Sequence, residues 1–363
     1  VNFDNNARMK QVFEGDLDIE RLVLAISAET GVSIEAENTL IIFDEIQEVP
    51  KALTSLKYFH ENAPQYAIVA AGSLLGVALH QGTSFPVGKV DFLDLYPLNF
   101  REFLCAMGEK QFVSMLDSCD TQMVTVFKTK YIERLREYYF VGGMPEVVKD
   151  FSEKKDYNRV RAIQKNLINY YQQDFSKHAE IKLVPRLNLV WNSIPMQLAK
   201  ENKKYIYGQV REGSRAKDFE LAIQWLLDCG LIHKVQRIQK PDLPLKAYID
   251  FDAFKLFLVD IGLLIAMTDL DAKVIIEGNK IFTEFKGSLT EQYILQQLIS
   301  DVGVIPYYYS TQNSKGEIDF LVQGKTSVIP IEVKAEENLK AKSLKAFCEK
   351  YQPSYAVRTS MSD

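Results

Sequence analysis

The pattern of apolar and polar positions changes character along the chain. Continuous apolar runs come first, at residues 39–45 and 66–73, and each ends in polar residues. Such runs are typical of parallel-sheet strands that are buried on both faces. Residues 90–98 predict a third strand, and the helical spacing of residues 51–62 predicts a crossover helix. These features together predict an α/β fold for this part.

A helical period follows from residue 99 to residue 174, interrupted at 141–148 by two glycines and a proline. Further on, a helix is predicted from Ser214 to Cys229, with Gly230 as its stop. Its buried face is predicted to carry five apolar residues: Phe219, Ala222, Ile223, Leu226 and Leu227. An alternating strand follows the helix, and this order is the one that a winged helix needs.

Residues 318–334 predict a β-hairpin with a turn at Lys325 and Thr326. The predicted cross-strand pairs are Ile318 with Val333, Phe320 with Ile331, and Val322 with Ile329. All six side chains of this face are apolar, and each gives about 1.5–3 kcal/mol on full burial. A shift by one residue would expose all of them, so the pattern fixes the register.

The same register places Asp319 directly opposite Glu332, with Lys334 two residues further along on the same side. Two carboxylates facing each other repel unless a cation lies between them. One interpretation is a metal site in which the acids bind Mg²⁺ and Lys334 orients the attacking water. The other is a solvated face on which Lys334 bridges both acids, worth only about 0–1 kcal/mol.

Glu291 is a further candidate, because it lies on a predicted helix and such sites often include a helical glutamate. The alternative is structural. Ser288 and Glu291 have the spacing of a capping box, in which the glutamate bonds back to the start of its own helix. The sequence does not decide between these two roles.

The run at 39–45 ends in Asp44 and Glu45, which is the form of a Walker B strand. The first acid would sit in the shell of Mg²⁺, and the second would polarise the attacking water of a nucleoside triphosphatase. Ser73, at the end of the next run, is a candidate sensor of the γ-phosphate. The alternative is a buried strand that ends in two exposed acids. The chain has no G-x-x-x-x-G-K-[ST] loop to hold phosphates.

Composition is that of an ordinary soluble protein, with 47% hydrophobic and 25% charged residues. The four cysteines and four histidines show neither disulfide nor metal-ligand spacing. No apolar run reaches the roughly 20 residues that a membrane span needs. We therefore expect a cytoplasmic protein without a membrane segment. No pattern sets the oligomeric state.

Net charge is uneven: residues 1–119 carry −9, residues 120–240 carry +8, and residues 241–363 carry −4. A basic middle part fits contact with nucleic acid, and it fits equally a set of helices docked on the acidic part. The candidate DNA-binding residues lie near the start of the helix predicted at 214–229: Arg211, Arg215 and Lys217.

Several motifs together resemble a bacterial and archaeal family of AAA+-type ATPases with a C-terminal domain of unknown function. That domain is similar to restriction-endonuclease-like nucleases of the PD-(D/E)xK class. The motifs are LIIFDEIQEVP, AAGSLLG, YPLNFREFL, GGMPEVV, AYIDFDAFKLFLVDIGLL and KGSLTEQYILQQL followed by YYYSTQNSKGEIDFLV and VIPIEVK. They occur in the family's order over most of the chain.

This resemblance implies three parts: an AAA+ ATPase core lacking Walker A at 1–140, a helical and winged-helix region at 141–270, and a restriction-endonuclease-like α/β domain at 271–363. It implies ATP and Mg²⁺ as cofactors, with a P-loop ahead of residue 1 in the full-length protein. Two activities are implied, an ATPase and a metal-dependent nuclease that processes DNA. The alternative is a nucleotide-switched scaffold or a DNA-binding regulator with an inactive nuclease fold.

Overall fold

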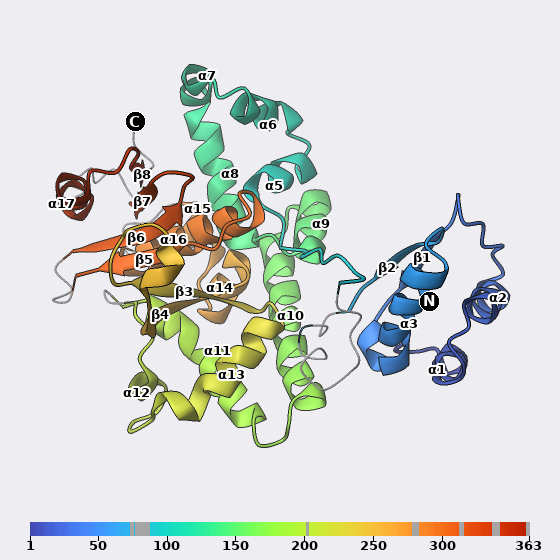
Figure 1. Cartoon of the computed structure of the whole chain (residues 1–363). Helices are drawn as coiled ribbons and strands as arrows, with labels where there is room; N and C mark the ends of the chain where they lie inside the picture. The colour runs from blue at the N-terminus through green and yellow to red at the C-terminus, as the bar shows by residue number, and fades with distance from the viewer. Residues whose placement is uncertain are drawn as a thin grey trace. The chain divides into compact units, whose positions relative to one another are not determined.

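The computed structural model (Figure 1) describes residues 1–72, 76, 88–200, 203–277, 283–311, 316–335 and 342–360. Spatial contacts divide the chain into two compact units. The first holds residues 1–95 together with 228–230, and the second holds residues 96–227 and 231–363. Each unit is described by itself.

The first unit contains two paired strands and the helices that pack on them. Its elements are α1 (Ala7–Glu14), α2 (Ile19–Thr30), β1 (Leu40–Phe43), η1 (Ile46–Glu48), α3 (Pro50–Asn62) and β2 (Ala67–Ala70). Strands β1 and β2 are parallel, and α3 is the crossover helix between them. The predicted parallel strands and crossover helix are therefore confirmed.

Burial in this unit is one-sided. Phe43 of β1 lies in a core with Phe3, Phe13 and Phe59, whereas Leu40, Ile42 and Val69 are about half exposed. The prediction that both faces of these strands are buried is wrong for the described residues, because helices cover one face only. The strand predicted at 90–98 is also wrong: these residues form no regular element, and Leu93 and Leu95 are exposed.

The second unit is mostly helical in its first half. Its helices are α5 (Phe100–Ala106), α6 (Lys110–Asp117), α7 (Thr121–Val126), α8 (Lys128–Val141), α9 (Pro145–Lys154), α10 (Tyr157–His178), α11 (Val184–Leu198), α12 (Tyr207–Val210), α13 (Ala216–Asp228), η2 (Leu245–Tyr248), α14 (Ile261–Met267), α15 (Ala272–Ile276), α16 (Thr283–Ser300) and α17 (Lys342–Tyr351).

The predicted break at 141–148 is the corner between α8 and α9. Gly142 has a φ of 75°, which favours glycine. A Cβ on Gly143 would lie 2.1 Å from the carbonyl oxygen of Leu98, so only glycine fits the close approach of the two backbones. The buried Asp260 accepts a hydrogen bond of 2.6 Å from the Gly143 N–H, and this bond holds the corner against the start of α14.

Among the described residues, the second unit has a six-stranded mixed sheet in the order β4-β3-β5-β6-β7-β8. The strands are β3 (Ile232–Ile238), β4 (Ile249–Leu258), β5 (Tyr307–Ser310), β6 (Glu317–Gln323), β7 (Val328–Val333) and β8 (Val357–Thr359). β3 pairs with β4 antiparallel and with β5 in parallel. α16 contacts β7, and α17 contacts both β6 and β7.

The predicted hairpin register is confirmed by β6 and β7. Phe320 pairs with Ile331, and Val322 pairs with Ile329. The predicted apolar face is buried in part: Ile318, Phe320, Ile331 and Val333 are buried, whereas Val322 and Ile329 are half-buried. Leu321 and Val328, on the opposite face, are buried as well. The apolar pattern was sufficient here because a slip of one residue would expose the whole face.

The predicted helix at 214–229 is α13, which begins two residues later, at Ala216. Phe219, Ala222, Ile223 and Leu226 are buried as predicted, and Leu227 is half-buried. The helix ends before Gly230, where the Leu231 N–H donates to the Leu226 carbonyl.

The following strands β3 and β4 form the antiparallel ribbon expected of a winged helix, but they belong to the large sheet and are not a free-standing wing. The predicted boundary between residues 270 and 271 thus separates strands of one sheet.

Candidate functional site

Asp44 and Glu45 follow β1 directly, at the end where parallel strands present catalytic acids. Asp44 accepts hydrogen bonds from Asn2 Nδ2 at 2.8 Å and from the Glu45 N–H at 3.1 Å. Glu45 has a φ of 52°, and its Oε2 accepts from Gln47 Nε2 at 2.5 Å. Both acids are half-buried, so the alternative of two exposed acids does not describe them. Ser73 lies outside the described residues.

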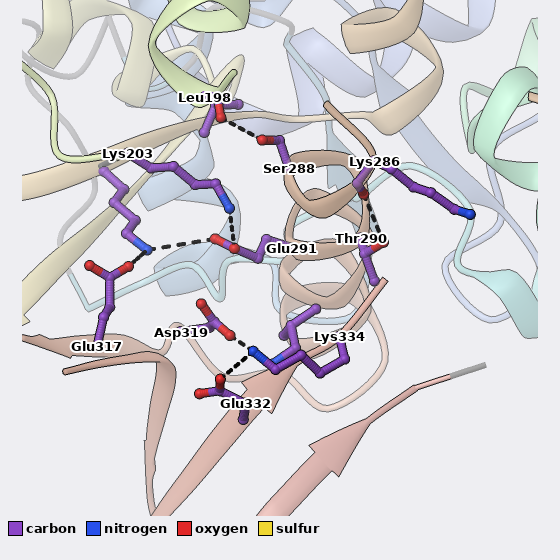
Figure 2. Close-up of polar contacts among 12 residues, drawn as sticks. Leu198, Lys203, Lys286, Ser288, Thr290, Glu291, Glu317, Asp319, Glu332 and Lys334 are labelled. Atoms are coloured by element: carbon purple, nitrogen blue, oxygen red, sulfur yellow. Dashed lines mark hydrogen bonds and ion pairs between the residues drawn. The ribbon is translucent and has the colours of Figure 1, made fainter. Parts of the chain in front are cut away.

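A second group of acids gathers in the other unit, between α16 and the sheet. Figure 2 shows Glu291 from α16, Asp319 from β6 and Glu332 from β7 near one another, with Lys334 just after β7. Glu291 and Glu332 are each only 4% exposed. The solvated face that the sequence left open is therefore wrong for this group.

A hydrogen bond and an ion pair hold the two acids that come from strands β6 and β7. Asp319 Oδ2 accepts from the Val333 N–H at 2.7 Å. Lys334 Nζ lies 2.6 Å from Glu332 Oε1, so among the described residues the lysine forms an ion pair with Glu332 and not with Asp319. The other oxygen, Glu332 Oε2, is buried and accepts no hydrogen bond from the described residues.

Three further charged residues that sequence reasoning missed complete the group: Lys203, Lys255 and Glu317. Lys203 pairs with Glu291 Oε1. Lys255 is fully buried on β4, with its Nζ 2.5 Å from Glu317 Oε1 and 3.6 Å from Glu291 Oε2. A charge inside the otherwise apolar stretch AFKLFLV (residues 253–259) was the available signal, because a buried lysine needs acidic partners.

Crowding of like charge shifts the proton affinities of these groups. Burial raises the pKa of Asp319 well above its ordinary value; the charges of Glu291 and Glu332 raise it further, while Lys255 and the Val333 N–H oppose the shift. Burial also acts to raise the pKa of Glu291, but Lys203 and Lys255 outweigh it and the pKa is lowered.

The pKa of Lys255 is set by the same two opposing effects, burial and neighbouring charges, but each acts in the opposite direction. Burial acts to lower the pKa of Lys255, but the charges of Glu291, Glu317 and Asp319 outweigh it and the pKa is raised. The neighbouring carboxylates therefore favour the charged form of Lys255.

The capping-box role considered for Glu291 is wrong. α16 begins at Thr283, so Ser288 and Glu291 lie within the helix and not at its start. Ser288 instead donates to the Leu198 carbonyl of α11 at 2.5 Å. The side chain of Glu291 is thus available to the charged group.

Amide side chains set the position of α16, and with it Glu291. Gln292 accepts from the Leu258 N–H at 3.0 Å and donates to the Leu258 carbonyl at 2.7 Å. One turn later, Gln296 accepts from the Ile261 N–H at 3.0 Å. Buried hydrogen bonds of this kind tie a helix to one register against its neighbour.

Divalent metal is the cofactor that these acids would suit, since Mg²⁺ prefers carboxylate oxygens. Two buried carboxylate oxygens, Glu291 Oε2 and Glu332 Oε2, accept no hydrogen bond from the described residues and could accept such a cation. Among the described residues, however, no three Asp, Glu, His or Cys side chains already stand in a metal-ligand arrangement. Binding would therefore require side chains to turn away from their present lysine partners.

The three predicted DNA-binding residues lie between the end of α12 and the first turn of α13. Arg211, Arg215 and Lys217 are all exposed. The Arg215 N–H donates to Asp218 Oδ2 at 2.8 Å, which leaves the guanidinium out of the capping contact.

A cavity of about 990 Å³ lies elsewhere in the second unit, lined by residues of α10, α11 and α14 and by Phe285 of α16. It contains none of the residues predicted to carry function. In the part of the chain that the structure describes, no helix has the length and apolar character needed to cross a membrane.

Comparisons with known proteins match three successive segments. Residues 1–104 match a family model described as an AAA domain. Residues 132–274 and 286–363 match two domains of unknown function, DUF8612 and DUF4143. The first match supports the relationship to AAA-type, nucleotide-binding ATPases that the N-terminal motifs predicted.

No curated protein matches the chain. Among solved structures, a Walker-type ATPase of Pyrococcus abyssi is similar over 70% of this chain and 68% of its own, with 14% sequence identity and a TM-score of 0.42.

Proposed function

We propose that this protein is an AAA-type ATPase whose C-terminal part is a Mg²⁺-dependent nuclease-like domain acting on DNA. The observation that carries the proposal is the meeting of Glu291, Asp319 and Glu332 from one helix and two strands, with Lys334 beside Glu332. A core built only for stability rarely brings three carboxylates together, because each must lose water and repel the others.

In this proposal Asp319, Glu332 and Glu291 would hold Mg²⁺. The bound metal would supply a Lewis acid for the phosphodiester and lower the pKa of a water molecule. Lys334, which is partly exposed, orients that water and offsets negative charge near the phosphate. Gln292 keeps α16 in the register that presents Glu291.

In the N-terminal part, Asp44 would belong to the shell of the Mg²⁺ that accompanies ATP, and Glu45 would polarise the attacking water. Ser73 keeps its proposed role as sensor of the γ-phosphate. The half-buried position of both acids at the end of β1 supports these roles, as does the AAA-domain match over residues 1–104. Nucleotide would then control when the C-terminal part acts.

The nuclease proposal is tested with supercoiled plasmid DNA. We expect the protein to nick it in Mg²⁺ or Mn²⁺ and not in EDTA. Lys334→Ala should slow cleavage by about 100-fold, the loss typical of a group that handles a proton, and still bind Mn²⁺. Lys345→Ala is a matched control, since that side chain is 80% exposed. Nicking that persists in EDTA, or an unaffected Lys334→Ala variant, would count against the proposal.

A second candidate function has its own observation in support. Lys203, Lys255 and Lys334 already neutralise most of the acids. A domain that keeps this pairing would bind no metal and would serve as a nucleotide-switched scaffold or DNA-binding regulator. Absence of metal-dependent nicking together with retained DNA binding would favour this function.

DNA binding itself is predicted to depend on the start of α13. Replacing Arg211, Arg215 and Lys217 by Ala should reduce the slope of log affinity against log salt by up to about three, because fewer counterions are released. Titration of a fluorescent duplex at several salt concentrations measures this slope. A control variant removes three positive charges elsewhere: Lys325, Lys345 and Lys350. Equal slopes for both variants would leave the α13 residues without a special role.

A further inference from the structure

Lys203 differs from the other lysines of the acidic group in how it is held. Its side chain is 12% exposed, and it comes from the segment between α11 and α12, outside any helix or strand. Lys255, by contrast, is fully buried on β4 and is held by Glu317 at 2.5 Å. Lys203 can therefore leave its partner by turning into solvent, whereas Lys255 cannot.

The partner of Lys203 is an acid that needs a cation. Glu291 is 4% exposed, and a carboxylate so buried is costly without a compensating positive charge. Lys203 contacts Glu291 Oε1, while Glu291 Oε2 has Lys255 at 3.6 Å and accepts no hydrogen bond from the described residues. The ammonium of Lys203 thus occupies one of the two oxygens through which Glu291 could bind a metal ion.

Charge balance points the same way. The group contains four carboxylates (Glu291, Glu317, Asp319 and Glu332) and three ammonium groups (Lys203, Lys255 and Lys334). Whatever the protonation of Asp319, a divalent cation adds two positive charges to a poorly hydrated group. Departure of Lys203 removes one of them.

We propose that Lys203 is a built-in competitor of the divalent metal: its ammonium occupies Glu291 when metal is absent and is displaced when metal binds. The inference rests on the proposed metal site and adds its regulation. An observation that points to a ligand independently of Lys203 is Glu332 Oε2, a buried oxygen that accepts no hydrogen bond from the described residues. Lys203 keeps the acids paired between binding events and sets the metal concentration at which the site fills.

The test is calorimetric titration of the whole chain with Mn²⁺. Lys203→Met should bind Mn²⁺ about tenfold more tightly than wild type, a coupling typical of competing ligands. Lys203→Arg should bind no more tightly than wild type, since it keeps the competing charge. Lys200→Met is the matched control, because Lys200 is exposed and forms no ion pair in the described residues.

A measurement on wild type covers the case in which Lys203→Met does not fold. An amine-reactive reagent should modify Lys203 several-fold faster in Mn²⁺ than in EDTA, while Lys200 reacts equally in both. Equal Mn²⁺ affinity of wild type and Lys203→Met would overturn the competitor role and leave the metal site standing. Absence of Mn²⁺ binding in both proteins would overturn the competitor role and the metal site together.

Discussion

Replacing Lys255 by Met is expected to lower the free energy of unfolding by about 3–5 kcal/mol, the usual cost of removing one partner from a buried ion pair. Lys255 is 0% exposed, and its Nζ lies 2.5 Å from Glu317 and 3.6 Å from Glu291. Methionine fills nearly the same volume, so lost packing contributes little. The loss arises because the buried carboxylates keep their charge and lose their common cation.

Urea unfolding followed by circular dichroism measures this change, with Lys246→Met as control. Lys246 is exposed and forms no ion pair in the described residues, so its substitution should change stability by less than about 0.5 kcal/mol. Glu317→Gln combined with Lys255→Met should cost less than the sum of the two single changes, since the pair is lost together. A Lys255→Met variant as stable as the control would mean that the acids do not depend on this lysine.

The sequence predicted local features correctly where a single physical effect determined the local structure. The register of β6 and β7 followed from the apolar face alone, and the corner at Gly142 and Gly143 followed from glycine and proline spacing. The prediction of a strand at 90–98 was wrong, because an apolar run forms a strand only when it can pair with a neighbouring strand. Leu98 instead donates its N–H to the carbonyl oxygen of Gly143 at 2.7 Å.

The candidate site was predictable in part for the same reason. Asp319 and Glu332 could be placed together because they share a hairpin, in which sequence spacing sets geometry. Lys203 and Lys255 come from a loop and a distant strand, and only the folded chain brings them to Glu291. The role of Glu291 was ambiguous because the start of α16 could not be located, and the start decides whether Ser288 is a cap.

Replacing Asp319 by Ala or Asn is expected to weaken Mn²⁺ binding by at least about 100-fold, since even residues that only support metal ligands contribute 10–100-fold. Cleavage of DNA should fall to background for the same reason. The two substitutions should differ in stability. Asn keeps an acceptor for the Val333 N–H, which Asp319 now binds at 2.7 Å. Ala removes it and leaves a donor without a partner, at a cost of about 1–3 kcal/mol.

The stability of wild type should also depend on pH in a direction set by Asp319. Burial and the charges of Glu291 and Glu332 raise the pKa of Asp319 in the folded protein. Between the ordinary carboxyl pKa of about 4 and that raised value, the folded chain holds a proton that the unfolded chain releases. This contribution to stability is complete below the ordinary pKa and is lost as pH rises through the folded pKa.

Asp319→Asn removes that titration, so its stability relative to wild type should increase from pH 4 upward in metal-free buffer. Unfolding by urea at a series of pH values in EDTA tests this, with Asp252→Asn as the exposed control. Addition of Mn²⁺ should reverse the order and make wild type the more stable protein, because only wild type gains binding energy. If wild type and Asp319→Asn kept parallel pH profiles and neither responded to Mn²⁺, Asp319 would have no raised pKa and the metal site would be wrong.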